Sequence, residues 1–160
     1  MDEIQAIQAL GYTYREAVFL YLVARASGYF LTRQFNSFIR REDGAIAHAF
    51  LTKLREREHV RTIDYGQRRF VFHLNCKTIY ALLGIPESQN RRSKSDAEVQ
   101  MRLMILDYIN DRLQDRFLLT PQEKVNFFTS LPLLSASDLP AKSFLVSNGR
   151  AGTIERFFVE

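Results

Sequence analysis

Apolar side chains recur at helical spacing in the first thirty residues and cover most of the circumference of a helix. Thr13 and Glu16 precede most of this run at the spacing of a capping box, in which each side chain binds a backbone N–H that the first helical turn leaves unpaired. Gly28 is a natural C-terminal stop. The pattern predicts a largely buried helix from Thr13 to Gly28, with a short helical segment over residues 2–10 before it.

Two shorter helices are predicted next. Thr32 offers an N-cap to a helix over residues 33–40, whose apolar side consists of Phe35, Phe38 and Ile39. A polar break at residues 42–44 leads to a third helix over residues 45–58, with Ala47, Phe50, Leu51 and Leu54 on one side. Two short helices joined by a tight turn that contains glycine are typical of a helix-turn-helix.

A two-residue alternation of side chains over residues 60–74 on either side of a turn at residues 65–68 predicts a β-hairpin with a basic tip. The alternating side chains are those of Val60, Thr62, Asp64, Phe70, Phe72 and Leu74. A short closing helix over residues 78–83 ends at Gly84 and Pro86.

The second half of the chain begins with a polar, basic stretch at residues 85–94, which predicts a mobile linker. Ser95 and Glu98 form a further capping box and open a long helix to about Phe117. This helix carries two apolar stripes, of which the second consists of Met101, Met104, Ile105 and Tyr108, so it needs partners on more than one side.

A short helix starting with Pro121 is predicted next, followed by a possible hairpin of residues 143–147 and 153–159 around a turn at Asn148 and Gly149. Because the chain then stops at Glu160 inside an apolar strand, we expect either a truncated unit or an edge strand that another chain completes. The expected fold class is mainly α with a small β-hairpin wing, in three parts: residues 12–84, a linker at 85–94, and a helical association unit at 95–160.

Charge is unevenly distributed between these parts. Residues 1–94 hold 15 Lys or Arg against nine Asp or Glu, a formal charge of +6, whereas residues 95–160 carry −2. Clustered positive charge is the electrostatic footprint of nucleic-acid binding. No apolar run approaches the length that crosses a bilayer and no signal peptide is visible, so we expect a soluble cytoplasmic protein with no membrane partner.

Motifs for metal binding and catalysis are missing from the sequence. Cys76 is the single cysteine, and the histidines at positions 48, 59 and 73 do not have metal-ligand spacing with it. Neither a nucleophile with its base nor a glycine-rich phosphate loop occurs at motif spacing. We therefore expect no catalytic residue, no metal and no cofactor.

The order of three helices and a hairpin with a basic tip resembles the winged helix-turn-helix family, including regulators of the multiple-antibiotic-resistance repressor kind and plasmid replication-relaxation proteins. The resemblance covers residues 12–84. Its most telling stretch is AHAFLTKLREREHVRTIDYGQRRFVFHL at residues 47–74, which looks like a recognition helix followed by strand, wing and strand. Glu58 and His59 stand where the family commonly has a glycine and an apolar residue.

The resemblance implies that the third helix enters the major groove of double-stranded DNA. Its outward residues would then be Ala45, His48, Ala49, Thr52 and Lys53. Gln67, Arg68 and Arg69 at the wing would reach the minor groove or flanking phosphates, and Thr32, Arg33 and Gln34 would hold phosphate at the start of the second helix. No Arg, Asn or Gln stands on the outward face of the third helix to make bidentate contacts with bases, which argues against strong base reading. Sequence-specific and weakly specific binding of DNA therefore both stay open.

The expected function is therefore double-stranded DNA binding by a transcriptional regulator, as a homodimer through the helix at residues 95–117. Two alternatives stay open. The winged helix could serve as a protein-interaction module, which its donor-poor recognition face favours. The chain could also be the N-terminal part of a mobile-element replication or nuclease protein.

Overall fold

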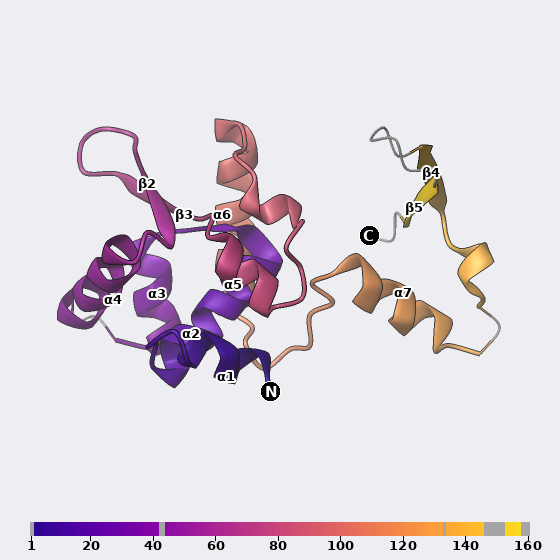
Figure 1. Cartoon of the computed structure of the whole chain (residues 1–160), viewed down its shortest axis with the longest axis horizontal. Helices are drawn as coiled ribbons and strands as arrows, with labels where there is room; N and C mark the ends of the chain where they lie inside the picture. The colour runs from indigo at the N-terminus through magenta and orange to yellow at the C-terminus, as the bar shows by residue number, and fades with distance from the viewer. Residues whose placement is uncertain (1, 42–43, 133, 146–152, 158–160) are drawn as a thin grey trace. The chain divides into compact units, whose positions relative to one another are not determined.

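The protein is mainly helical with a small three-stranded antiparallel sheet (Figure 1). The computed structural model describes residues 2–41, 44–132, 134–145 and 153–157. The chain divides into two compact units, Met1–Asp115 and Arg116–Glu160, which are described separately below. In the described parts of the chain, no helix is long and apolar enough to cross a membrane.

The N-terminal helices follow the sequence pattern closely. Helix α1 spans Glu3–Gln8 and α2 spans Tyr14–Leu22, continuing as a π-helical turn over Val23–Ser27. The predicted capping box is confirmed, because the Thr13 N–H donates to Glu16 Oε2 at 2.7 Å and the Glu16 N–H donates back to Thr13 Oγ1 at 3.4 Å. Gly28 ends the helix in the left-handed region, at a φ of 77°.

Three strands form the sheet of the first unit: β1 (Tyr29–Phe30), β2 (Val60–Asp64) and β3 (Phe70–Leu74). Their order is β1-β3-β2, and both pairings are antiparallel. The predicted hairpin is confirmed, with Asp64 opposite Phe70 at its outer end. The central strand is β3, which the chain reaches last.

The sequence predicts one buried face of β3, whereas the structure buries both. Phe72 and Leu74 point into the main core, and Val71 and His73 on the other face are also buried. Val71 packs with Tyr29 and with Val99 of α6 (Asp96–Asn110) in a second small cluster. Buried and exposed side chains therefore do not alternate along β3, because helix α6 covers the second face of the sheet.

Helices α3 (Thr32–Ile39) and α4 (Gly44–Glu56) complete the core. Phe19 and Phe35 meet edge to face with their ring centroids 5.1 Å apart, and Phe35 stacks on Phe50 at 4.2 Å. Such aromatic pairs stabilise a core by about 0.5–1.5 kcal/mol beyond their buried area. These rings bring α2, α3 and α4 together over the sheet.

The observed N-cap of helix α3 differs from the residue that the sequence predicts. Leu31, not Thr32, is the N-cap, and the Leu31 N–H donates to Gln34 Oε1 at 2.8 Å. Gln34 therefore supplies the capping interaction from inside the helix, and Thr32 is the first helical residue.

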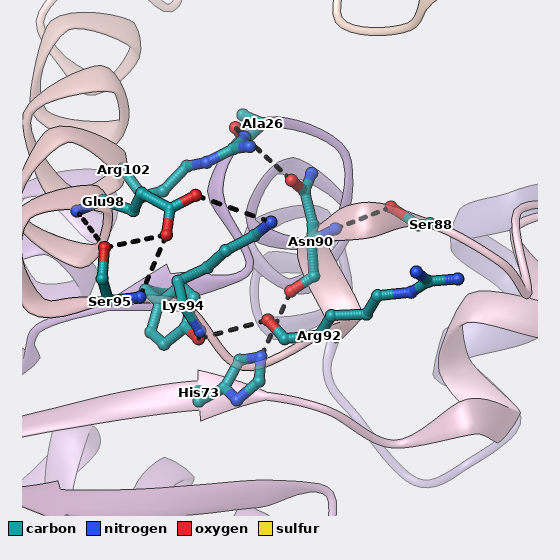
Figure 2. A network of polar contacts seen from close by, with 10 residues as sticks. Ala26, His73, Ser88, Asn90, Arg92, Lys94, Ser95, Glu98 and Arg102 are labelled. Carbon is teal, nitrogen blue, oxygen red and sulfur yellow. Dashed lines mark hydrogen bonds and ion pairs between the residues drawn. The ribbon is translucent and has the colours of Figure 1, made fainter.

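The expected linker at residues 85–94 is instead packed into the first unit. After α5 (Lys77–Leu82), residues Gln89–Arg91 form a 3₁₀ turn and the Asn90 side chain is buried. Its Nδ2 donates to the carbonyls of Ala24 and Arg25 at 3.0 and 2.9 Å. Its Oδ1 accepts from Arg102 at 2.8 Å, a contact that Figure 2 shows. This segment is therefore fixed by buried hydrogen bonds.

Helix α6 also belongs to the first unit, so the division of the chain lies after Asp115 and not at residue 94. Val99, Leu106 and Ile109 form its buried side. The helix ends at Asn110, earlier than the predicted Phe117, and Asp111 is its C-cap. The predicted N-terminal capping box of Ser95 and Glu98 is confirmed.

The second unit contains α7 (Pro121–Thr129), a 3₁₀ turn at Ala136–Asp138, and strands β4 (Ala141–Leu145) and β5 (Thr153–Phe157). The strands pair antiparallel, as predicted. The predicted turn at Asn148 and Gly149, and the last residues of the predicted strand, lie outside the described residues.

Candidate nucleic-acid interface

Helix α4 presents one buried and one exposed side. Ala47, Phe50, Leu51 and Leu54 are buried in the core, as the sequence predicts. Ala45, His48 and Ala49 are exposed on the opposite side, and Thr52 is half-buried at its edge. A continuous outward face is therefore available over two helical turns, with small side chains that would let a backbone or a base edge come close.

Lys53 does not belong to this face, which corrects its expected outward position. Its Nζ lies 2.7 Å from Glu16 Oε2, the carboxylate that also caps α2. The same ammonium lies 5.4 Å from the centroid of the Tyr12 ring. Lys53 thus joins α4 to α2, and its positive charge is already compensated.

The hairpin tip carries exposed Gln67, Arg68 and Arg69 on a tight turn. Gly66, Gln67 and Arg68 all have positive φ, and the Arg69 N–H donates to the Gly66 carbonyl at 3.0 Å. A left-handed backbone costs a non-glycine residue about 1 kcal/mol or more. Among the residues that the structure describes, no carboxylate forms an ion pair with Arg68 or Arg69.

The three expected phosphate contacts at the start of α3 have different surroundings. Thr32 is half-buried and Arg33 is exposed, but Gln34 is 0% exposed. Gln34 Nε2 donates to the Leu103 carbonyl at 2.8 Å and to Asp107 at 2.9 Å. The expectation that Gln34 contacts DNA is therefore wrong, because its amide is used inside the protein.

Arg33 is exposed but paired. Its guanidinium donates to both carboxylate oxygens of Asp107, at 2.8 and 2.6 Å. Partial burial acts to raise the pKa of Asp107, but the hydrogen bonds from Arg33 and Gln34 outweigh it and hold that pKa below its usual value. The hydrogen bond to Asp107 in turn raises the pKa of Arg33. A phosphate would have to compete with this carboxylate.

One further arginine, Arg55, lies close to the outward face and was missed from the sequence. Arg55 is exposed, and its guanidinium carbon lies 5.2 Å from the centroid of the Phe72 ring. Arg55 follows Thr52 by three residues, so helical spacing could have identified it. Arg61 on β2 is also exposed, but it lies opposite His73 in the strand register and so on the other face of the sheet from the one that packs against α4.

The end of α4 is held by a compact polar cluster. Glu58 occupies the left-handed region at a φ of 55°, at a position where winged helix-turn-helix proteins, which the sequence resembles, commonly have glycine. His59 Nδ1 and the Tyr12 hydroxyl are 2.7 Å apart, and the Arg57 guanidinium lies 5.2 Å from the Tyr12 ring centroid. Burial, with the charge of Arg57, lowers the pKa of His59, so this imidazole is neutral near pH 7. The cluster fixes the turn between α4 and β2.

In the described ranges, no group of three or more His, Cys, Asp or Glu side chains is placed to hold a metal ion. Cys76 is half-buried just before α5 and has no disulfide. The expectation of a non-catalytic protein stays a prediction.

A comparison with protein-family models, curated proteins and solved structures finds no match to this chain.

Proposed function

We propose that residues 12–84 form a winged helix-turn-helix module that binds double-stranded DNA. In this proposal α4 lies in the major groove and the β2–β3 hairpin is the wing, whose tip contacts phosphates or the minor groove.

The observation that carries the proposal is the order of the elements together with the strand pairing. The chain runs α2, β1, α3, α4, β2, β3, and β1 pairs with β3 at the edge opposite β2. The three helices and the hairpin are those that the resemblance implies, with α3 and α4 as the helix-turn-helix, and strand β1 is an addition that the sequence did not predict. It leaves one side of α4 exposed beside a hairpin whose tip ends in two arginines.

Positive charge around α4 favours the phosphate backbone as the main contact. Arg55, Arg68 and Arg69 are exposed in this region, and Arg33 adds a fourth cation that is paired with Asp107. Phosphate contacts position a protein on DNA without reading its sequence. The module therefore binds many duplexes through these arginines.

Sequence discrimination is weak in this proposal. With Lys53 and Gln34 used inside the protein, His48 and Thr52 are the polar side chains that the expected contact set retains near the bases. A good bidentate contact discriminates by about 1–3 kcal/mol, and neither side chain provides the usual bidentate pairing to guanine or adenine. We expect discrimination between duplexes to be small.

The test uses charge-matched variants. Arg68→Ala/Arg69→Ala removes two cations from the hairpin tip, whereas Arg15→Ala/Lys77→Ala removes two exposed cations from α2 and α5. Fluorescence anisotropy with a mixed-sequence duplex is expected to show a weaker complex and a shallower salt slope for the hairpin variant only. Equal losses in both variants would contradict a specific role of the wing.

A second function, association through α6, rests on a different observation. Met101, Met104 and Tyr108 are 61%, 66% and 54% exposed and, with Ile105, form one stripe along α6. This α6 stripe is the second apolar stripe that the sequence predicts, and it lies on the side of the helix opposite the buried residues. We propose that it mediates a homodimer, which would place two winged helices on two half-sites.

Light scattering tests the dimer. The proposal expects about twice the 18.7 kDa chain mass at micromolar concentration, and the chain mass alone for Met101→Gln/Met104→Gln. A monomeric wild type would contradict it.

For the DNA-binding activity we propose that the protein regulates transcription in the cytoplasm.

A further inference from the structure

The inner side of the hairpin and helix α6 enclose a groove in the first unit, with a volume of about 690 Å³. Leu31 and Thr32 at the start of α3 also line it, so three elements meet there. This volume lies within the range of about 300–1,000 Å³ that is typical of small-molecule sites.

The groove has an apolar floor. Val71 of β3 and Val99 of α6 are buried at its base, where they pack together with Leu31 and Leu103. Phe70, at the outer end of the hairpin, adds a partly exposed aromatic wall. An aromatic or aliphatic body of a ligand would replace water over this surface, which favours binding because apolar area is removed from water.

The polar lining is strongly biased toward positive charge. Arg33, Arg68 and Arg69 line the groove, whereas Asp96 contributes the one carboxylate in the lining. Asp96 Oδ1 already accepts a hydrogen bond of 2.8 Å from the Tyr65 hydroxyl, which ties the hairpin to the start of α6. Arg33 is compensated by Asp107, but the described residues offer no ion pair to the two arginines of the hairpin tip. The groove is therefore complementary to an anion.

We propose that this groove binds a small soluble amphipathic anion, with one carboxylate, sulfonate or phosphate group held by Arg68 and Arg69 and an apolar body over Val71, Val99 and Leu103. Arginine suits all three head groups because its planar guanidinium donates two parallel hydrogen bonds. The site does not depend on DNA binding. If the wing contacts phosphate as well, ligand and DNA compete for the same two arginines, and the ligand releases the DNA.

The test uses a pair of probes on the DNA-free protein, so its result is independent of the proposed DNA binding. Anilinonaphthalenesulfonate carries an anionic group, and phenylnaphthylamine has the same rings without it. Both report burial by fluorescence. The variant is Arg68→Gln/Arg69→Gln, with Arg15→Gln/Lys77→Gln as the control of equal charge change outside the groove lining.

The proposal expects one saturable sulfonate site, weakened about tenfold or more in the hairpin variant, because the substitutions remove both charged donors that hold the sulfonate. Binding of the neutral probe should change by less than about twofold, and the control should match wild type. Methyl signals of Val99 and Leu103 should shift on titration with the sulfonate.

Three results would overturn it. The hairpin variant could bind the sulfonate as wild type does, or it could lose both probes equally while its circular dichroism is unchanged. Alternatively, Met101→Gln/Met104→Gln could weaken the sulfonate more than the arginine variant does, which would place the probe on the α6 stripe.

Discussion

Arg33 and Asp107 form a two-pronged ion pair between the first turn of α3 and helix α6, with N···O distances of 2.8 and 2.6 Å. The pair joins residues 74 positions apart in the chain. Arg33 is exposed at the start of α3, so under the proposed DNA binding this ion pair occupies a cation that could otherwise contact phosphate.

Releasing this arginine should strengthen DNA binding. In Asp107→Asn the guanidinium loses its carboxylate, and we expect about three- to tenfold tighter duplex binding at about 0.1 M salt, with a salt slope steeper by about 0.9 for one added phosphate contact. Asp111→Asn, which removes an exposed carboxylate one turn further along, is the control. The same gain in both variants would show that only the overall charge matters.

Gln34→Ala should destabilise the protein without a direct effect on DNA contacts. The substitution leaves the Leu31 N–H and the Leu103 carbonyl without their partner, and each unpaired buried group costs about 1–3 kcal/mol. We expect the free energy of unfolding to fall by about 2–4 kcal/mol in urea titrations. The exposed Gln100→Ala should change it by less than about 0.5 kcal/mol. A Gln34→Ala protein as stable as wild type would contradict the packing described.

A substitution of Asn90 tests whether residues 85–94 behave as part of the core. Asn90→Ala removes three side-chain hydrogen bonds, to Ala24, Arg25 and Arg102. We expect faster amide hydrogen exchange over this segment and a loss of about 2–4 kcal/mol in unfolding free energy. Gln89→Ala, at the exposed neighbouring position, should leave both unchanged. Rapid exchange already present in the wild type would restore the linker interpretation.

The lowered pKa values of two histidines predict that the protein is less stable in mild acid. Burial is the main cause that lowers the pKa of both His59 and His73, so the unfolded chain binds more protons there than the folded chain does. The contribution of these neutral histidines to the free energy of unfolding is complete above the unfolded-state pKa of about 6.5. It is lost as the pH falls from there through the lower pKa values of the folded state. The free energy of unfolding should therefore decrease from about pH 7 to about pH 5.

Single substitutions assign this slope to its residues. His59→Gln or His73→Gln should flatten the dependence of unfolding free energy on pH, whereas the exposed His48→Gln should leave it unchanged. A slope that survives in both buried-histidine variants would assign it to carboxylates instead.

Local signals in the sequence predicted most of the helices and the β2–β3 hairpin, but they missed the two-residue strand β1 and the early end of α6. The capping boxes at Thr13 and Ser95 and the stop at Gly28 involve residues close in the chain, so their spacing is sufficient. Long polar side chains were harder to place. Lys53 turns toward Glu16, 37 positions away, and Gln34 toward Asp107, 73 positions away, and such pairings are set by tertiary packing that helical periodicity does not contain.

The linker error has a similar cause. Polar composition at residues 85–94 is typical of solvated loops. Asn90 nevertheless donates to the carbonyls of Ala24 and Arg25 in the π-helical turn, which it can reach only after the chain has folded. Composition therefore identified the absence of a long helix or strand there and could not identify the burial.

Binding of a mixed-sequence duplex by the wild-type protein, measured by anisotropy between about 50 and 200 mM salt, tests the central claim most directly. With about three phosphates neutralised by Arg55, Arg68 and Arg69, affinity should fall by about fortyfold over this range. No detectable complex at the lower salt concentration, or an affinity that does not change with salt, would contradict DNA binding by this module.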